Sequence, residues 1–142
     1  RYSTSETGII LVYMLDTDIC SYIIKKRPSN AQDIFDSLDD DEVCISVITQ
    51  AELLYGLVRL PERNKINPLI SEFIKNIEIL DWDGEAAKEY ARLRVFLEKK
   101  GKPSGNLDMM IAAHALSVNA TLVSNNLRHF AGIPKLKTEN WV

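Results

Sequence analysis

The fold of this 142-residue chain is decided by the stretch Ile9-Ile10-Leu11-Val12-Tyr13-Met14-Leu15-Asp16-Thr17-Asp18. Its first seven residues are apolar and rich in β-branched side chains, which predicts a buried parallel strand over 9–16. In open sheets of parallel strands, ligands bind beyond the carboxyl ends of the strands. A carboxylate at that edge is costly unless a cation binds it, so Asp16 is predicted to lie in a ligand-binding crevice.

Composition is ordinary for a globular protein, with 46% hydrophobic and 26% charged residues. We expect one domain over 9–142, and we interpret 1–13 as a leader plus the start of the first strand, in part added to the natural chain. No apolar run is long enough to span a bilayer and no signal peptide is evident, so we expect a cytoplasmic protein. The two cysteines, Cys20 and Cys44, are predicted to be free thiols.

Strands and helices are predicted to alternate along the chain. After 9–16, the strands are expected at 42–46, 77–80, 121–124 and 136–138. The helices are expected at 19–25, 29–38, 49–57, 62–75, 84–100, 107–118 and 127–131, the second capped by Ser29 or Asn30 and the fourth interrupted at Pro68. This alternation predicts an α/β fold, a three-layer α/β/α sandwich around a mainly parallel sheet.

Three acids stand where such a fold would bring them together. Asp16 ends the first strand, Glu52 lies early in the helix after the second strand, and Asp108 lies in the first turn of the Ala-rich helix. The polar run Ser124-Asn125-Asn126 leaves the fourth strand at the same edge. Clustered carboxylates repel one another unless a metal binds them, and an all-oxygen set favours Mg²⁺ or Mn²⁺ over zinc.

Each of these residues also has a structural interpretation. Asp16 could cap the next helix, Asp108 could be an ordinary first-turn acid, and Glu52 could be solvated surface. Asn126 could be a turn residue. We favour a site because these features occur on four elements that meet at one edge. His114 is interpreted as structural or solvent-facing, and the acidic run 39–42 as a solvated loop.

At these positions the sequence resembles the PIN-domain nucleases, and most closely their VapC toxins. The resemblance rests on Asp16-Thr17 after an apolar strand, Ser46-x-x-Thr49-x-x-Glu52-Leu53, Asn106-x-Asp108-x-x-Ile111-Ala112 and Ser124-x-Asn126-x-x-x-Phe130. It extends from about Met14 to Trp141, nearly the whole chain. No single motif is specific, but four motifs in the family's order and spacing are strong evidence.

The resemblance implies a metal-dependent endoribonuclease, the toxin of a type II toxin–antitoxin system, with Mg²⁺ or Mn²⁺ as cofactor. Asp16, Glu52 and Asp108 match the family's metal-binding acids, and Asn126 stands where many PIN domains have a fourth Asp. Thr17 and Ser124 match small hydroxyl residues that line the site. The resemblance also implies an RNA substrate such as tRNA, a homodimer, and a VapB-like antitoxin whose complex with the toxin binds operator DNA.

Two positions depart from the family pattern. Asp18 replaces the usual Asn, and its carboxylate either joins the metal site or caps the following helix. We favour capping, because Asp and Asn are nearly equivalent N-caps. Leu107 stands where an Asn commonly precedes the third acid, which removes any polar role at that position.

Because the net charge is −3, RNA binding needs a local basic patch or a metal. The candidates near helix ends and in the loop before Asp108 are Lys25, Lys26, Arg27, Lys99, Lys100 and Lys102. Apolar residues cover more than one face of the early helices, which predicts an interface with a second copy. The group comprises Tyr22, Ile23, Ile24, Leu53, Leu54, Tyr55, Leu57 and Val58.

Two other classes of function compete with the nuclease. Asp16-x-Asp18 after an apolar strand also occurs in haloacid-dehalogenase phosphatases, with the first Asp as nucleophile, but Cys20 stands where that motif usually has Thr or Val. A non-catalytic module that binds RNA or the antitoxin would suit the acidic charge but leaves the clustered acids unexplained. Metal-dependent RNA cleavage that EDTA abolishes would separate the three.

Overall fold

A five-stranded sheet, parallel throughout, forms the centre of the computed structural model, which describes residues 3–4, 10–27, 30–62 and 64–142. Its strands, in spatial order, are β5 (Glu78–Leu80), β4 (Val43–Ser46), β3 (Tyr13–Leu15), β6 (Thr121–Val123) and β7 (Lys137–Glu139). In the register of the central strands, Met14 lies between Cys44 and Leu122. All of these strands therefore end at the same edge of the sheet.

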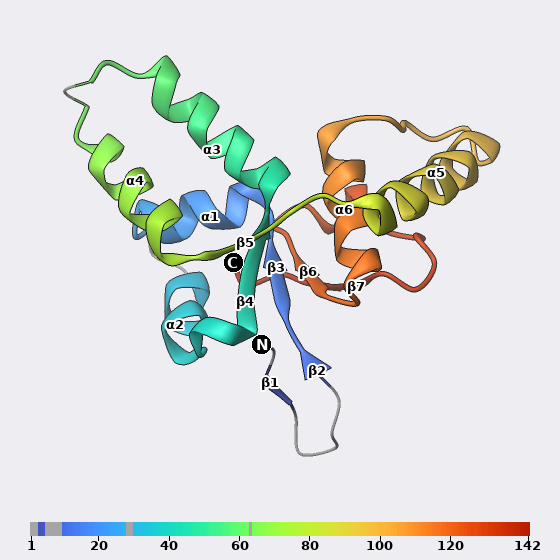
Figure 1. Cartoon of the computed structure of the whole chain (residues 1–142), viewed down its shortest axis with the longest axis horizontal. Helices are drawn as coiled ribbons and strands as arrows, with labels where there is room; N and C mark the ends of the chain where they lie inside the picture. The colour runs from blue at the N-terminus through green and yellow to red at the C-terminus, as the bar shows by residue number, and fades with distance from the viewer. Residues whose placement is uncertain (1–2, 5–9, 28–29, 63) are drawn as a thin grey trace.

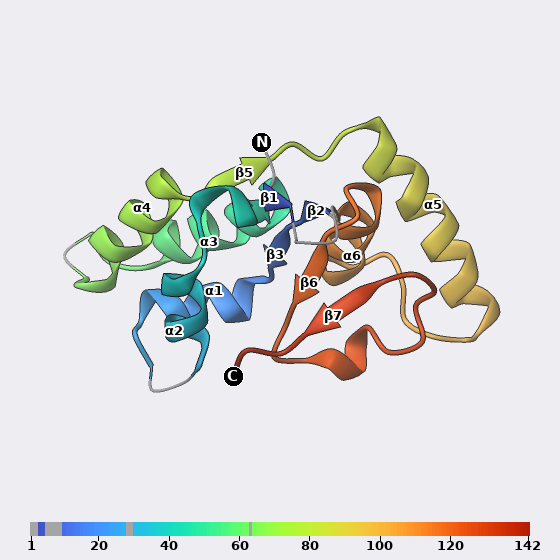
Figure 2. The same cartoon turned by 90° about the horizontal axis from the view of Figure 1, so that it is seen from below.

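Helices cover both faces of the sheet (Figures 1 and 2). They are α1 (Thr17–Ile24), α2 (Asn30–Ser37), α3 (Val47–Arg59), α4 (Ile66–Asn76), α5 (Gly84–Lys99) and α6 (Leu107–Ser117). Two short 3₁₀ turns, η1 (Asp40–Glu42) and η2 (Leu127–His129), join the larger elements.

Side chains alternate between two cores, one on each face of the sheet. Met14 and Leu122 pack with residues of α5 and α6, whereas their neighbours Leu15 and Val123 pack with residues of α1, α3 and α4. Successive residues of a strand point to opposite faces, and each face is sealed by helices. The predicted three-layer α/β/α sandwich is confirmed.

The first strand differs from its predicted span of 9–16. Residues Ile10–Leu11 form β2, which pairs antiparallel with β1 (Ser3–Thr4) outside the main sheet. Only Tyr13–Leu15 belongs to the main sheet as β3, and Asp16 follows it as the N-cap of α1. The rest of the expected leader, 1–2 and 5–9, lies outside the described residues.

Several helix boundaries also differ from prediction. The helix α4 begins at Ile66 rather than at residue 62, and it contains Pro68 without a break. Pro68 lies in the first turn, where backbone N–H groups have no partner inside the helix, so the missing N–H costs little. Asn30 is the first residue of α2, and Ser29 lies outside the described residues.

The thiol prediction is confirmed, because Cys20 and Cys44 are buried and neither forms a disulfide. Met14 and Ile19 are also fully buried and help to make up the surrounding cores. None of the helices in the described part of the chain is long and apolar enough to cross a membrane.

Candidate active site

The candidate site lies where the strand order reverses at the middle of the sheet. From β3 the chain passes to β4 on one side, while β6 lies on the other side and leads on to β7. Asp16 follows β3 directly, and Ser124 follows β6. Loops that leave two neighbouring strands in opposite directions open a crevice at this point, which is where ligands bind in open α/β sheets.

Asp16 is buried and held by two hydrogen-bond donors. Its Oδ1 accepts a hydrogen bond from the Ile19 backbone N–H at 2.9 Å, which makes Asp16 the N-cap of α1. The Ser124 side chain donates to the same carboxylate. Asp16 is 7% exposed and Ser124 is fully buried. The carboxylate is thus fixed in orientation between the ends of β3 and β6.

The charge of Asp16 is not neutralised. The pKa of Asp16 is raised to about 6, mainly by burial and also by the nearby charges of Asp18 and Asp108, against the lowering effect of the bonds from Ser124 and the Ile19 N–H. Within the described part of the chain, no basic side chain forms an ion pair with Asp16. A buried carboxylate among other acids is the environment in which a bound cation stabilises most.

Glu52 reaches the site from the second turn of α3. It is half-buried, and its Oε1 accepts a hydrogen bond of 2.5 Å from the Thr17 hydroxyl. Thr17 is the first residue of α1 and directly follows Asp16. The bond therefore links Glu52 to the turn that carries Asp16, beside which Thr17 lies.

Asp108 lies on the other side of the crevice, in the first turn of α6. Its Oδ2 is 3.1 Å from Nδ1 of His129, and the His129 ring nitrogens are each 3.2 Å from Nδ2 of Asn126. The Asn126 backbone N–H in turn donates to Ser124 Oγ at 2.9 Å. A chain of polar contacts thus connects Asp16 to Asp108 through Ser124, Asn126 and His129.

The donor set suits a hard cation, although its side chains are not gathered around one point. No group of three or more His, Cys, Asp or Glu residues in the described ranges is arranged to hold a metal ion. Asp108 is turned to His129 and Glu52 to Thr17, so each of these acids is bonded to a neighbour instead. The uncompensated, buried carboxylate of Asp16 and the oxygen-only acids beside it fit Mg²⁺ or Mn²⁺ by chemistry.

The structure corrects the capping role expected of Asp18. Asp18 is exposed at the second position of α1, and the cap is Asp16, two residues earlier. The helix begins at Thr17 rather than at residue 19, because the Asp16 carboxylate reaches the Ile19 N–H. Asp16 therefore serves both as the buried acid of the site and as a helix cap.

His129 is a member of the site that sequence reasoning missed. It lies on η2, three residues after Asn126, and a single 3₁₀ turn brings the two side chains together. The signal was available in the sequence Ser124-x-Asn126-x-x-His129, because polar residues three apart on a turn share a side.

His114 is structural, one of its two predicted roles. It is 1% exposed, and its Nδ1 lies 2.7 Å from Ser46 Oγ. Burial lowers the pKa of His114, against the opposing effects of Asp83 and of the Asp81 backbone and carboxylate. Because Ser46 Oγ already accepts from the Ile48 N–H, its hydroxyl hydrogen can donate to Nδ1 of a neutral ring.

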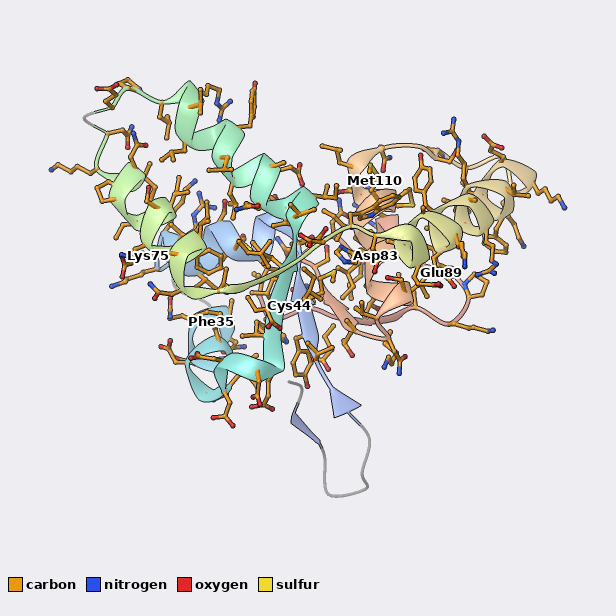
Figure 3. All side chains as sticks on the ribbon, viewed as in Figure 1. Phe35, Cys44, Lys75, Asp83, Glu89 and Met110 are labelled. Atoms are coloured by element: carbon orange, nitrogen blue, oxygen red, sulfur yellow. The ribbon has the colours of Figure 1, made fainter. Side chains whose placement is uncertain are left out.

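The same end of the sheet is tied to α6 by a second contact. Trp82, between β5 and α5, donates from Nε1 to the Met110 carbonyl of α6 at 3.0 Å. Figure 3 labels Met110 and Asp83, the residue that follows Trp82, near this junction. In the acidic run 39–42, Asp39, Asp40 and Asp41 are exposed as predicted and Glu42 is half-buried; Glu42 ends the one-turn helix η1 and accepts from the N–H of its cap, Asp39.

The basic residues proposed for RNA binding are divided by the fold. Lys102 lines one cavity together with His129, and Lys25 lines another together with Thr17 and Glu52. Arg27 stacks on the Tyr22 ring. The remaining candidates, Lys26, Lys99 and Lys100, line neither of these two cavities.

The chain is similar to known proteins over most of its length. Residues 13–136 match the family model of the PIN domain. The chain is 43% identical over 135 residues to a ribonuclease named VapC2 from Haemophilus influenzae, covering 94% of this chain and 100% of that protein. It is 40% identical over 134 residues to a tRNA(fMet)-specific endonuclease VapC from Shigella flexneri, covering 93% and 99%.

The fold is likewise similar to that of a solved complex. The crystal structure of VapBC2 from Rickettsia felis, bound to a DNA fragment from its promoter, matches with a TM-score of 0.83 and 38% identity. The match covers 93% of this chain and 100% of the other. The matched region is large enough to include the strands and helices that carry Asp16, Glu52 and Asp108.

Proposed function

This chain belongs to the PIN-domain family and, within it, to the VapC ribonucleases, and from that premise we propose that it is the endoribonuclease toxin of a toxin–antitoxin pair. The observation that carries the proposal is Asp16, a buried and uncompensated carboxylate at the point where the strand order reverses. Glu52 and Asp108 approach the same crevice from two different helices.

The cofactor proposed is Mg²⁺ or Mn²⁺, held by Asp16, Glu52 and Asp108. A divalent ion bound there would activate water and stabilise the negative charge that develops on the phosphodiester. To bind it, Glu52 would give up its bond to Thr17, and Asp108 its bond to His129. Both contacts lie at half-exposed positions, where exchange with solvent costs little.

The chain's own residues position these acids. Ser124 and the Ile19 N–H hold the Asp16 carboxylate in one orientation, so no rotamer search is needed on binding. The Thr17 hydroxyl places the Glu52 carboxylate on the same side of the crevice. Asn126, fixed through its backbone to Ser124, presents an uncharged amide that can orient a water molecule or a substrate oxygen.

The proposed substrate is RNA, and tRNA in particular, because a relative with 40% identity is named as a tRNA(fMet)-specific endonuclease. Incubation of the purified chain with initiator tRNA and Mn²⁺ should yield discrete fragments, and EDTA should abolish the cut. Phosphatase activity without RNA cleavage would instead indicate the haloacid-dehalogenase mechanism. RNA or antitoxin binding without turnover under Mn²⁺ would indicate a binding module.

The proposed partner is a VapB-like antitoxin that inhibits the nuclease and, together with it, binds operator DNA. The support is the similarity to a solved VapBC complex that holds promoter DNA. A basic side chain of the antitoxin, an arginine, would pair with the uncompensated acids and compete with the metal. The proposed RNA substrate, together with two buried cysteines that form no disulfide, supports action in the cytoplasm.

A homodimer is also proposed, although fewer exposed apolar residues support it than the sequence indicated. Ile23, Ile24 and Leu53 are buried in the core, so they are not available to a partner. On α3, however, Tyr55 is 67% and Val58 83% exposed, and Leu54 lies beside them at 39%. These three side chains form an apolar strip that a second copy of the chain would cover.

A further inference from the structure

A cavity of about 240 Å³ lies beside Asp108, between the loop that precedes α6 and the turn η2. Its apolar floor includes the buried side chains of Leu97 and Met109. Its polar wall includes Lys102, Arg128 and His129. An apolar floor with a few convergent polar groups is the usual character of a site for a small organic group.

The two cations of this cavity come from different elements and have no acidic partner. Lys102 belongs to the loop between α5 and α6, and Arg128 belongs to η2. Neither forms an ion pair with any side chain in the described ranges, and no acidic residue is among those that line the cavity. Two exposed cations close together repel each other, so an anion between them would be stabilising.

Lys102 extends across the cavity toward the turn that follows η2. A Cβ atom built on Gly132 would lie 3.8 Å from Lys102 Nζ. Gly132 has a φ of +82°, a conformation that side-chain-bearing residues rarely adopt. The ammonium group therefore faces the turn that directly follows η2, the element that carries Arg128, and both cations line the same cavity.

The cavity shares a wall with the acids. His129 lines it and, at the same time, lies 3.1 Å from Asp108 Oδ2. A ligand seated on Lys102 and Arg128 is thus one side chain away from the carboxylates that would hold the metal. A larger cavity, between α1, α2 and α4, has Asp40 and Glu72 in its lining and does not include the acids of the site.

We propose that this cavity binds one nucleotide of the RNA strand, next to the phosphodiester that is cut. The base would lie on the apolar floor, and the adjoining phosphate would bind Lys102 and Arg128. The inference rests on the proposed ribonuclease function and adds to it a subsite that positions the strand. It makes these two residues binding residues, in contrast to the acids, which would act on the reacting phosphate.

The test compares two charge-matched double variants of the full chain. Lys102→Gln with Arg128→Gln removes both cations of the cavity. Lys65→Gln with Lys75→Gln removes two exposed cations at the ends of α4, which lies across the molecule from η2 and α6 (Figures 2 and 3). Binding of a fluorescein-labelled single-stranded RNA of mixed sequence is measured by anisotropy in EDTA, over a series of salt concentrations.

The cavity variant should bind RNA roughly tenfold more weakly than the wild-type chain. Its plot of log affinity against log salt should be shallower by about 0.7 for each phosphate group that the variant no longer binds. The α4 variant should match the wild-type chain in both. Equal affinity and slope in the two double variants would overturn the subsite, as would the absence of RNA binding by the wild-type chain at low salt.

Cleavage in Mn²⁺ separates this proposal from the function on which it rests. If the wild-type chain cuts no RNA, the ribonuclease proposal fails. If it cuts RNA and the two double variants have the same KM, only the subsite fails. Thermal unfolding shows whether the variants fold, and the single variants Lys102→Gln and Arg128→Gln replace the pair if the double variant does not.

Discussion

At the scale of single residues, Asp16 combines two roles that oppose each other. As the N-cap of α1, its carboxylate accepts the Ile19 N–H and stabilises the helix. As a buried charge near Asp18 and Asp108, it costs stability until a cation binds. The two roles can be separated by substitution, because asparagine caps a helix about as well as aspartate but carries no charge.

Asp16→Asn should therefore abolish RNA cleavage without harming the fold. Loss of a residue that hydrogen-bonds a metal ligand already lowers metal affinity or activity by up to about 100-fold. Loss of the charge of the ligand itself should therefore lower RNA cleavage by more. In EDTA, the thermal midpoint of Asp16→Asn should equal or exceed that of the wild-type chain. Asp16→Ala should lose about 1 kcal/mol relative to Asp16→Asn, because it removes the cap. RNA cleavage by Asp16→Asn at the wild-type rate would exclude Asp16 from the site.

The raised pKa of Asp16 predicts a pH-dependent stability of the metal-free chain. The folded value is about 6 against an ordinary value of 3.8, so the protonated form is favoured on folding. Protonation of Asp16 stabilises the folded chain fully below pH 3.8, and this stabilisation is lost as the pH rises through 6. The free energy of unfolding falls by roughly 3 kcal/mol in all. Urea unfolding in EDTA should show this loss as the difference between the wild-type chain and Asp16→Asn. A difference that does not change with pH would contradict the burial of this charge.

At the scale of elements, the site depends on how α3 and α6 are held relative to each other, since they carry Glu52 and Asp108. The buried contact between His114 of α6 and Ser46, the N-cap of α3, connects the two helices directly. Ser46 also accepts the Ile48 N–H, so one hydroxyl group serves both the cap and the contact. The contact between His114 and Ser46 therefore helps to set the distance between Glu52 and Asp108.

Substitutions of His114 and Ser46 should each lower the free energy of unfolding, and the two effects should not be additive. His114→Ala leaves a buried hydroxyl without its partner, which costs about 1–3 kcal/mol in addition to the packing of the ring. Ser46→Ala removes the cap and the contact together. The double variant should be less destabilised than the sum of the single variants, by about 0.5–3 kcal/mol, in urea unfolding. Strict additivity would show that the two side chains do not interact.

At the scale of the whole molecule, the predicted self-association depends on the apolar strip of Leu54, Tyr55 and Val58 on α3. Tyr55 is partly covered by Arg59, whose guanidinium carbon lies 5.6 Å from the ring centroid. Val58 has no such cover and is the most exposed of the large apolar side chains among the described residues. A charge placed there would have to be desolvated in any interface.

Val58→Asp should convert a dimer into a monomer, as measured by light scattering at micromolar concentration. The mass of the wild-type chain should be twice that of the 16.1 kDa monomer. Because Val58 is exposed in the single chain, the circular dichroism spectrum of the variant should match that of the wild-type chain. A wild-type chain that is monomeric under these conditions would refute the dimer.

The sequence by itself determined the layers of this protein and the elements that carry its acids. Apolar runs with helical or strand periodicity predict the strands and most helices, because burial of those runs is a local property of the chain. The position of Asp16, Glu52 and Asp108 at one edge followed from the rule that parallel strands end together. For the same reason, Ser124 and Asn126 could be assigned to that edge from the sequence alone.

Only the tertiary structure decided what each acid touches. Asp16 rather than Asp18 caps α1, because the cap depends on backbone angles at one residue, which spacing alone does not define. His129 joins Asp108 across 21 positions of the chain, and Lys102 lines the same cavity as Arg128 from another loop. Such contacts depend on the packing of distant segments, and no local pattern in the sequence encodes the path of a loop in space.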